Sequence, residues 1–124
     1  MVSCFVFIVY WLRCIAVCVS GQGKGGESID GGFIPDEFHA SLSHSKRGIV
    51  SMANNAPNTN GSQFFICYAA NALQFDNKYT IIGEVIDGWD VLDAMEMAPV
   101  QGKKNRPVTD IIMNSYTMHA NPLA

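Results

Sequence analysis

The most informative part of this 124-residue chain is one continuous stretch, Met52-Ala53-Asn54-Asn55-Ala56-Pro57-Asn58-Thr59-Asn60-Gly61-Ser62-Gln63-Phe64-Phe65-Ile66. It links two apolar runs through a long polar segment, which is too long for a two-residue hairpin. Asn, Pro and Gly each bend or lock the backbone, so such a link can hold exposed N–H and C=O groups in a fixed direction for an extended ligand. A surface loop without a ligand is the alternative interpretation.

The flanking sequence predicts a domain built mainly from strands. Four short runs are rich in β-branched and aromatic residues and are bounded by Gly, Asn and Asp, which is typical of strands. They are residues 49–52, 64–68, 79–86 and 111–119. Side chains alternate along a strand, so Phe64 and Phe65 must face opposite sides of the sheet.

One short helix is expected late in the chain. Trp89, Leu92 and Met95 recur at three-residue steps, with Asp87 placed to cap the start and Pro99 to stop the end. Mostly strands with one late helix favours an antiparallel barrel or an α+β domain over a parallel sheet.

The first twenty residues differ in composition from the rest, because only Ser3, Arg13 and Ser20 are not apolar. We expect residues 1–20 to be a leader unrelated to the fold, and residues 21–124 to form the domain. A signal peptide or a membrane anchor is the alternative, but Arg13 interrupts the apolar run, at a cost of roughly 2.5–3.5 kcal/mol for a membrane span. The β-branched run from Phe5 to Tyr10 could also add one strand to the domain.

Composition excludes several classes of protein. Hydrophobic residues make up 48% and charged residues 15%, too apolar for a disordered chain. The net charge of −3, without a basic run, gives no electrostatic basis for binding nucleic acid directly. One cysteine, Cys67, follows the first twenty residues, so we expect a small buried strand residue rather than a disulfide, and a reducing compartment. His39, His44 and His119 show no ligand spacing relative to any cysteine pair, so no metal or other cofactor is expected.

A glycine pattern at residues 21–26 matches the dinucleotide-binding motif G-x-G-x-x-G. That motif needs a helix directly after the glycines, whereas Gly31, Gly32 and Pro35 interrupt the following residues. We therefore reject a nucleotide site here.

Residues 52–66 as a unit resemble the signature of the cyclophilins, the peptidyl-prolyl cis-trans isomerases that also bind cyclosporin. The resemblance continues upstream through residues 23–29 and Phe38, and downstream through residues 78–80, 82–85 and 88–95. The step at residues 78–80 and the ending at 119–122 resemble a nuclear, spliceosome-associated branch of that family. A nuclear or cytoplasmic location is therefore expected, with a secreted or membrane-tethered form as the alternative if the leader is a signal or anchor.

The resemblance implies a mainly β fold, an antiparallel eight-stranded barrel with capping helices and a peptide groove on one face. We expect the barrel to be incomplete, because sequence matching the family's N-terminal strands and first helix is missing. The positions that match the family's peptide-binding site are Ala53, Asn54, Asn55, Gln63, Phe65, Phe75 and Tyr79. Gln74 stands where several relatives carry a tryptophan important for cyclosporin, so the resemblance implies weak cyclosporin binding at most.

The resemblance also implies a catalytic arginine in a Phe-His-Arg stretch, and this sequence has no such stretch. Arg13, Arg47 and Arg106 match no catalytic position. We therefore assign no catalytic residue and expect a weak or inactive isomerase of X-Pro bonds with partial binding surface for proline-containing peptides. The alternative is a non-catalytic proline-peptide-binding module or spliceosome-associated scaffold.

Overall fold

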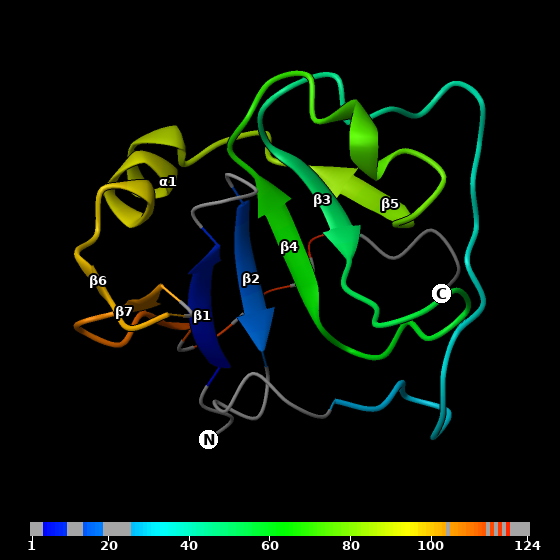
Figure 1. Cartoon of the computed structure of the whole chain (residues 1–124), viewed down its shortest axis with the longest axis horizontal. Helices are drawn as coiled ribbons and strands as arrows, with labels where there is room; N and C mark the ends of the chain where they lie inside the picture. Colours follow the sequence, from blue (N-terminus) through cyan, green and yellow to red (C-terminus); the bar gives the residue numbers. More distant parts are fainter. Residues whose placement is uncertain are drawn as a thin grey trace.

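The computed structural model describes the backbone of Cys4–Val9 and Cys14–Cys18, residues 26–103 and 105–113, and residues 115, 117 and 119. Two sheets, one α-helix and one 3₁₀ turn make up this part of the chain (Figure 1). The strands are β1 (Cys4–Val9), β2 (Cys14–Cys18), β3 (Ile49–Met52), β4 (Phe64–Cys67), β5 (Ile81–Glu84), β6 (Val100–Gln101), β7 (Arg106–Pro107) and β8 (Ile112–Met113). The 3₁₀ turn η1 is Leu73–Phe75 and the helix α1 is Trp89–Glu96.

Six strands form the main sheet in the order β5-β3-β4-β2-β1-β8, and β6 pairs with β7 in a separate two-stranded sheet. Every pairing is antiparallel, as the sequence predicts. No pairing between β5 and β8 closes the main sheet within the described residues. The mainly β class is confirmed, whereas a closed barrel is not observed in this part of the chain.

The N-terminal strands correct our expectation that residues 1–20 lie outside the fold. The strand β2 pairs with β4 over four residues, from Cys14 opposite Cys67 to Val17 opposite Phe64, and β1 pairs with β2 in turn. An apolar, β-branched run such as residues 14–18 can pair with the second edge of β4, which would otherwise be open. Composition alone could not separate such strands from a leader.

Residues of β4 divide the packing of the molecule between two clusters. Phe65 and Cys67 are buried together with Ile49, Ala72 and Phe75. On the other side Phe64 and Ile66 pack against the buried Tyr68 and Leu92. The alternation expected for Phe64 and Phe65 is therefore observed, and Cys67 is a fully buried strand residue, as predicted.

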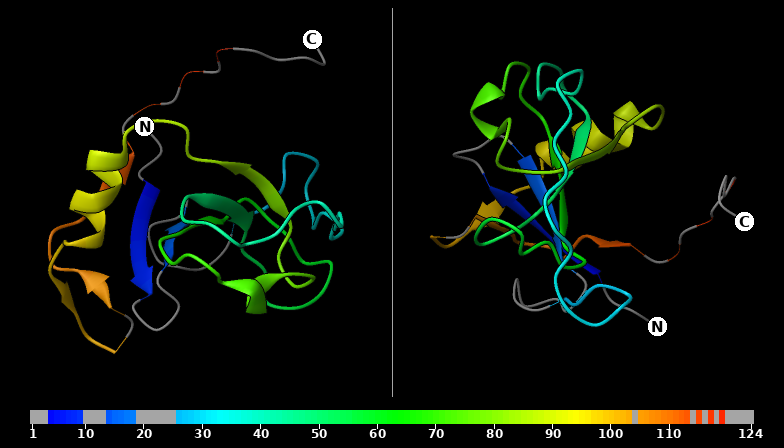
Figure 2. Two further views of the ribbon diagram at one scale, coloured as in Figure 1. Left: turned by 90° about the horizontal axis from the view of Figure 1, so that it is seen from above. Right: turned by 90° about the vertical axis from the view of Figure 1, so that its right-hand side faces the viewer.

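The helix α1 lies beside the second cluster and buries Leu92 (Figure 2). Our expectation that Asp87 caps its start is wrong, because the N-cap is Gly88 at φ +78°, a conformation that glycine adopts easily. Asp87 instead accepts a hydrogen bond from the Gly88 N–H at 2.7 Å. Within the described residues no helix is long and apolar enough to cross a membrane.

Three predicted strands are shorter than expected, and β4 ends at Cys67 rather than Tyr68. The strand β5 begins at Ile81 rather than Tyr79, because the Tyr79 N–H donates to the Phe75 carbonyl in the turn after η1. The strand β8 covers only Ile112–Met113 of the run expected over 111–119, part of which lies outside the described residues.

Candidate functional site: an aromatic patch beside a pinned loop

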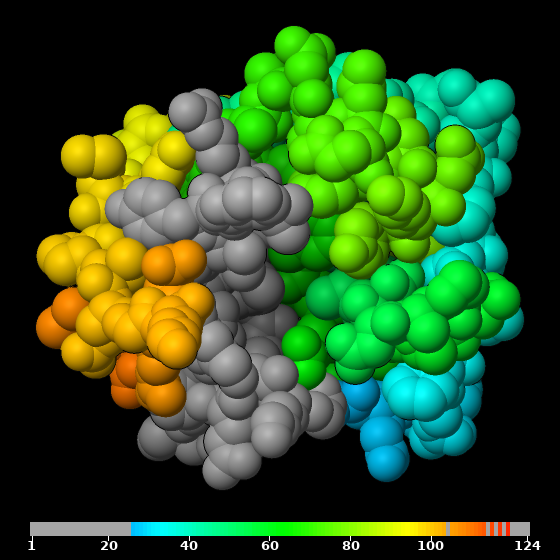
Figure 3. All heavy atoms as spheres, in the orientation of Figure 1, coloured from blue at the N-terminus to red at the C-terminus, as the bar shows by residue number. Residues whose placement is uncertain are grey.

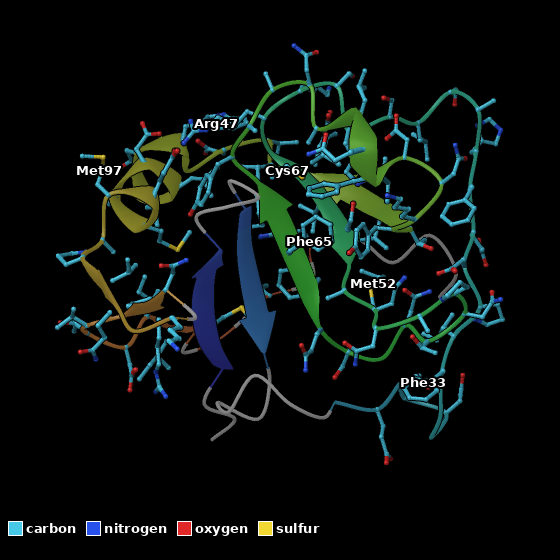
Figure 4. The ribbon with its side chains drawn as sticks, viewed as in Figure 1. Phe33, Arg47, Met52, Phe65, Cys67 and Met97 are labelled. Carbon is cyan, nitrogen blue, oxygen red and sulfur yellow. The ribbon has the colours of Figure 1, made fainter. Side chains whose placement is uncertain are left out.

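Three aromatic rings form an apolar patch at the end of the main sheet. Phe65 comes from β4, Phe75 from η1, and Tyr79 from the turn that follows. Their ring centroids lie 5.1–5.6 Å apart in edge-to-face arrangements, the geometry that aromatic pairs prefer. Phe65 and Phe75 are 5% and 4% exposed, whereas Tyr79 is half-buried and carries the patch to the surface. Figure 4 shows Phe65 on β4.

A buried histidine packs against the patch. The His44 ring lies 5.7 Å from Phe75 and 6.4 Å from Phe65, centroid to centroid. Its Nδ1 is 2.7 Å from Asp76 Oδ1, and its Nε2 is 2.8 Å from the hydroxyl of Ser51. Both ring nitrogens are therefore hydrogen-bonded, which fixes the ring against the two phenylalanines.

The connectivity from Ser51 through His44 to Asp76 is that of a nucleophilic triad. Ser51 and His44 have no exposed surface, so a substrate carbonyl cannot reach the serine hydroxyl. The network is therefore structural. Hydrogen bonds from the Ser43 hydroxyl and from His44 lower the pKa of Asp76 and keep its carboxylate charged.

The polar loop is held in one conformation at its base. The Ala53 N–H donates to the Gln63 carbonyl at 2.9 Å, which joins the two ends of the loop. The Asn54 side-chain amide donates to Lys78 O at 3.1 Å and to Asn60 Oδ1 at 3.3 Å. Within the described part of the chain, the hydrogen bonds of Asn54 all come from this amide. Among the same residues, its backbone N–H and C=O have no hydrogen-bond partner.

Asp36 holds the same loop from the preceding segment. Its Oδ2 accepts from the Asn58 N–H at 2.7 Å, and its Oδ1 accepts from the Asn60 side chain at 2.8 Å. The Asp36 N–H in turn donates to Asn58 Oδ1 at 2.9 Å. Asn58 adopts φ +60°, which Asn tolerates better than most residues, so these three bonds stabilise a conformation that is costly elsewhere.

The expected peptide-site residues largely gather at one place. Phe65, Phe75 and Tyr79 are in mutual contact, and Ala53 packs against the same cluster. Asn54, Asn55 and Tyr79 line one depression of about 280 Å³. The Gln63 carbonyl bonds to Ala53, which places Gln63 at the base of the loop. Gln74 is exposed on η1.

Sequence reasoning missed the residues that support this site. His44 and Asp76 are 32 positions apart, and Asp36 and Asn58 are 22 apart. Neither pair forms a local motif, so no sequence signal could have joined them.

The two arginines whose side chains the structure describes form ion pairs with residues outside the aromatic patch and the polar loop. Arg47 donates to Asp93 and, at 3.1 Å, to Glu96, and its guanidinium lies over the rings of Tyr68 and Trp89. Figure 4 shows Arg47 near α1, whereas Phe65 lies on β4. Arg106 forms an ion pair with Asp110 at 2.9 Å. Arg13 lies outside the described residues.

Two other kinds of chemistry find no support at this site. Burial raises the pKa of the Cys67 thiol to about 11, so it is not a thiolate nucleophile near neutral pH. In the described part of the chain, no three His, Cys, Asp or Glu side chains come together as metal ligands.

Comparison with known proteins identifies relatives of this fold and sequence. The family model described as "Cyclophilin type peptidyl-prolyl cis-trans isomerase/CLD" matches residues 11–118. Peptidyl-prolyl cis-trans isomerase-like 3 from Gallus gallus is 55% identical over 104 residues, covering 84% of this chain and 64% of the relative. The Homo sapiens protein of the same name is 51% identical over 105 residues, covering 85% and 65%. The chain thus spans just under two thirds of the length of these relatives.

A solved structure is also similar. A Cryptosporidium parvum cyclophilin-type peptidyl-prolyl cis-trans isomerase, crystallised in the presence of the dipeptide Ala-Pro, matches with a TM-score of 0.86 and 38% sequence identity. The match covers 97% of this chain and 76% of that one. The cyclophilin resemblance drawn from residues 52–66 is confirmed, including its similarity to isomerase-like 3 proteins.

Proposed function

The chain belongs to the cyclophilin-type peptidyl-prolyl cis-trans isomerases, and from that premise we propose that its aromatic patch and pinned loop bind proline-containing peptides. The contact between Phe65, Phe75 and Tyr79, directly beside the loop that carries Asn54, is the observation that carries the proposal. The patch would receive the proline ring. The Asn54 backbone would pair with the peptide on one side of it.

This geometry suits the chemistry of the reaction only in part. Rotation about an X-Pro bond crosses a barrier of roughly 20 kcal/mol, because the imide nitrogen shares its lone pair with the carbonyl. No covalent step is needed. A protein accelerates the rotation by holding the ring, tethering one flank, and aiming a donor at the nitrogen of the twisted state.

We propose that the 124-residue chain is a weak isomerase, because its described residues offer the ring site and the tether but no arginine beside them to act as the donor. The carboxylates of Asp93, Glu96 and Asp110 hold Arg47 and Arg106. Loss of one such donor reduces turnover about 100-fold or more in other enzymes. A protease-coupled isomerisation assay should therefore give a rate at least about 100-fold below that of the full-length human relative measured alongside. Equal turnover would refute the proposal.

A non-catalytic binding role is the second candidate, and the same engagement of both described arginines favours it. The two functions differ in one comparison. A binding module shows affinity for a proline peptide with no acceleration above the uncatalysed rate, whereas a weak isomerase shows both. We also propose that cyclosporin binds weakly, since the exposed Gln74 gives no large ring for that ligand. A nuclear or cytoplasmic location is proposed from the resemblance at residues 78–80 and 119–122.

A further inference from the structure

Asn60 is a buried residue of the polar loop, and hydrogen bonds hold both its side chain and its backbone. The side-chain amide donates to the Ile34 carbonyl at 3.1 Å and to Asp36 Oδ1 at 2.8 Å, and Oδ1 accepts from the Asn54 amide at 3.3 Å. The backbone N–H donates to the Ile34 carbonyl at 3.3 Å, and the backbone carbonyl accepts from the Ile34 N–H at 2.8 Å. Asn60 is 1% exposed. It is therefore fixed where the loop meets the preceding segment.

Packing dictates the residue that follows Asn60. A Cβ atom on Gly61 would collide with the carbonyl oxygen of Gly26, so only glycine fits without a shift of the backbone. Figure 3 shows the segment of residues 30–40 (cyan) beside the loop of residues 53–62 (green) on the right of the molecule. The fold therefore requires an Asn-Gly pair in the loop. The backbone nitrogen after the asparagine is unshielded in such a pair, because glycine has no side chain.

An Asn-Gly pair can lose ammonia by reacting with its own backbone. The Gly61 nitrogen attacks Cγ of Asn60 and forms a C–N bond, the Cγ–Nδ2 bond breaks, and the Gly61 N–H proton leaves with the amide nitrogen as ammonia. The product is a cyclic imide. Water then opens the ring at one of its two carbonyls and leaves aspartate or isoaspartate at position 60. No group is oxidised or reduced in either step.

The folded loop opposes the first of these steps. Attack makes Cγ of Asn60 tetrahedral and expels Nδ2, and the bonds that Nδ2 donates to Ile34 and Asp36 resist both movements. The reaction therefore requires local opening of the loop. The product also resists closing again. A carboxylate has no N–H to donate to the Ile34 carbonyl, and it would bring a second negative charge beside Asp36 Oδ1.

We propose that Asn60 is a latent deamidation site, whose reaction turns a brief opening of the polar loop into a permanent loss of its conformation. The modification itself does not depend on the proposed proline site. Its consequence rests on that site, because a loop altered at position 60 no longer presents Asn54 to a peptide.

Tandem mass spectrometry after incubation at pH 8 measures the reaction at each asparagine. Asp36→Ala removes the acceptor of the Asn60 amide, so the open loop becomes more populated. We expect Asn60 to deamidate at least about tenfold faster in this variant than in the unmodified protein. Asp30→Ala, at an exposed residue, is the matched control and should leave the rate unchanged. Equal rates in Asp36→Ala and the unmodified protein would overturn the proposal.

A core variant separates local opening from unfolding of the whole domain. Ile49→Val removes one buried methyl group and none of the hydrogen bonds of the loop, and the fold should tolerate it. We expect its rate at Asn60 to stay within about twofold of that of the unmodified protein, because local opening does not involve the core. A rate that rises as much as in Asp36→Ala would contradict gating by the loop.

The consequence for binding is tested with Asn60→Asp, which is one of the two products. Isothermal titration calorimetry with the short blocked peptide Ala-Ala-Pro-Ala should show an affinity at least about tenfold lower than that of the unmodified protein. Asn71→Asp makes the same change at an exposed residue outside the loop and should keep the affinity. Unchanged affinity in Asn60→Asp would overturn the proposed loss of the loop. No binding by the unmodified protein would refute the proline site, and the deamidation rates would still decide the modification site.

Discussion

The pinned loop and the edge of β5 differ in how many of their polar groups are already hydrogen-bonded. Asp36, Asn54 and Asn60 tie the loop to its surroundings through side-chain hydrogen bonds. Leu42 and Ile82 instead are more than half exposed beside the edge of β5, which has no partner strand among the described residues. A surface with its bonds already made binds at little ordering cost, whereas an open edge gains bonds only when a partner arrives. The loop is therefore the surface that we propose for recognition of a single proline.

The sharpest test of this contrast removes the support of the aromatic patch. His44→Ala would leave a cavity under Phe65 and Phe75 and take a hydrogen-bond partner from Ser51 and Asp76. We expect a loss of about 3 kcal/mol in the free energy of unfolding, measured by urea titration. His39→Ala, at an exposed histidine, should cost less than about 0.5 kcal/mol. Similar values for the two variants would show that the patch does not depend on His44.

Releasing the loop should have the next largest effect. Asp36→Ala removes the acceptor for the Asn58 N–H and the Asn60 amide. We expect a loss of about 2 kcal/mol in the free energy of unfolding and weaker binding of the short proline peptide. Asp30→Ala, at an exposed position, is the matched control and should change neither. Unchanged peptide affinity in Asp36→Ala would mean that the loop needs no such anchor.

Strong acid should weaken the support of the aromatic patch through Asp76. The pKa of Asp76 is lowered in the folded state from its ordinary value of 3.8, so the unfolded chain binds the proton more readily. The stability that this carboxylate contributes is therefore present above about pH 3.8 and is lost as the pH falls further. Unfolding titrations at pH 5 and pH 3 should show a drop that Asp76→Asn reduces. An equal drop in both proteins would assign the acid sensitivity to other groups.

The smallest effect on the free energy of unfolding is expected at Ile82, beside the edge of β5. Ile82→Ser should change the free energy of unfolding by less than about 0.5 kcal/mol, because the side chain is more than half exposed. Phe65→Ala, at a buried ring of the patch, should cost about 3–5 kcal/mol in the same titration. A large loss of unfolding free energy in Ile82→Ser would show that the Ile82 side chain is already buried within the protein. The two surfaces would then not differ as described.

Local patterns predicted some parts of the molecule and not others. The bounds of β3, Ile49–Met52, are those expected from its apolar run, and the alternation of Phe64 and Phe65 followed from strand geometry. The resemblance to the family predicted Phe75 and Tyr79 as site residues, and their rings contact each other in the aromatic patch. The supports could not be found, because Asp36 and His44 act across gaps of more than twenty residues. The pairing of β2 with β4 was missed, because a continuous apolar run shows no alternation that would fix which residues pair with which.

The central claim is that the chain holds proline without an efficient donor for its rotation, and exchange NMR on one sample measures both properties. An isotope-labelled Ala-Ala-Pro-Ala peptide with the 124-residue chain reports binding through its chemical shifts and catalysis through cis–trans exchange. We predict shifts at the proline, with exchange at least about 100-fold slower than with the same concentration of the full-length human relative. Exchange as fast as that relative's, or a spectrum unchanged by the protein, would contradict the account.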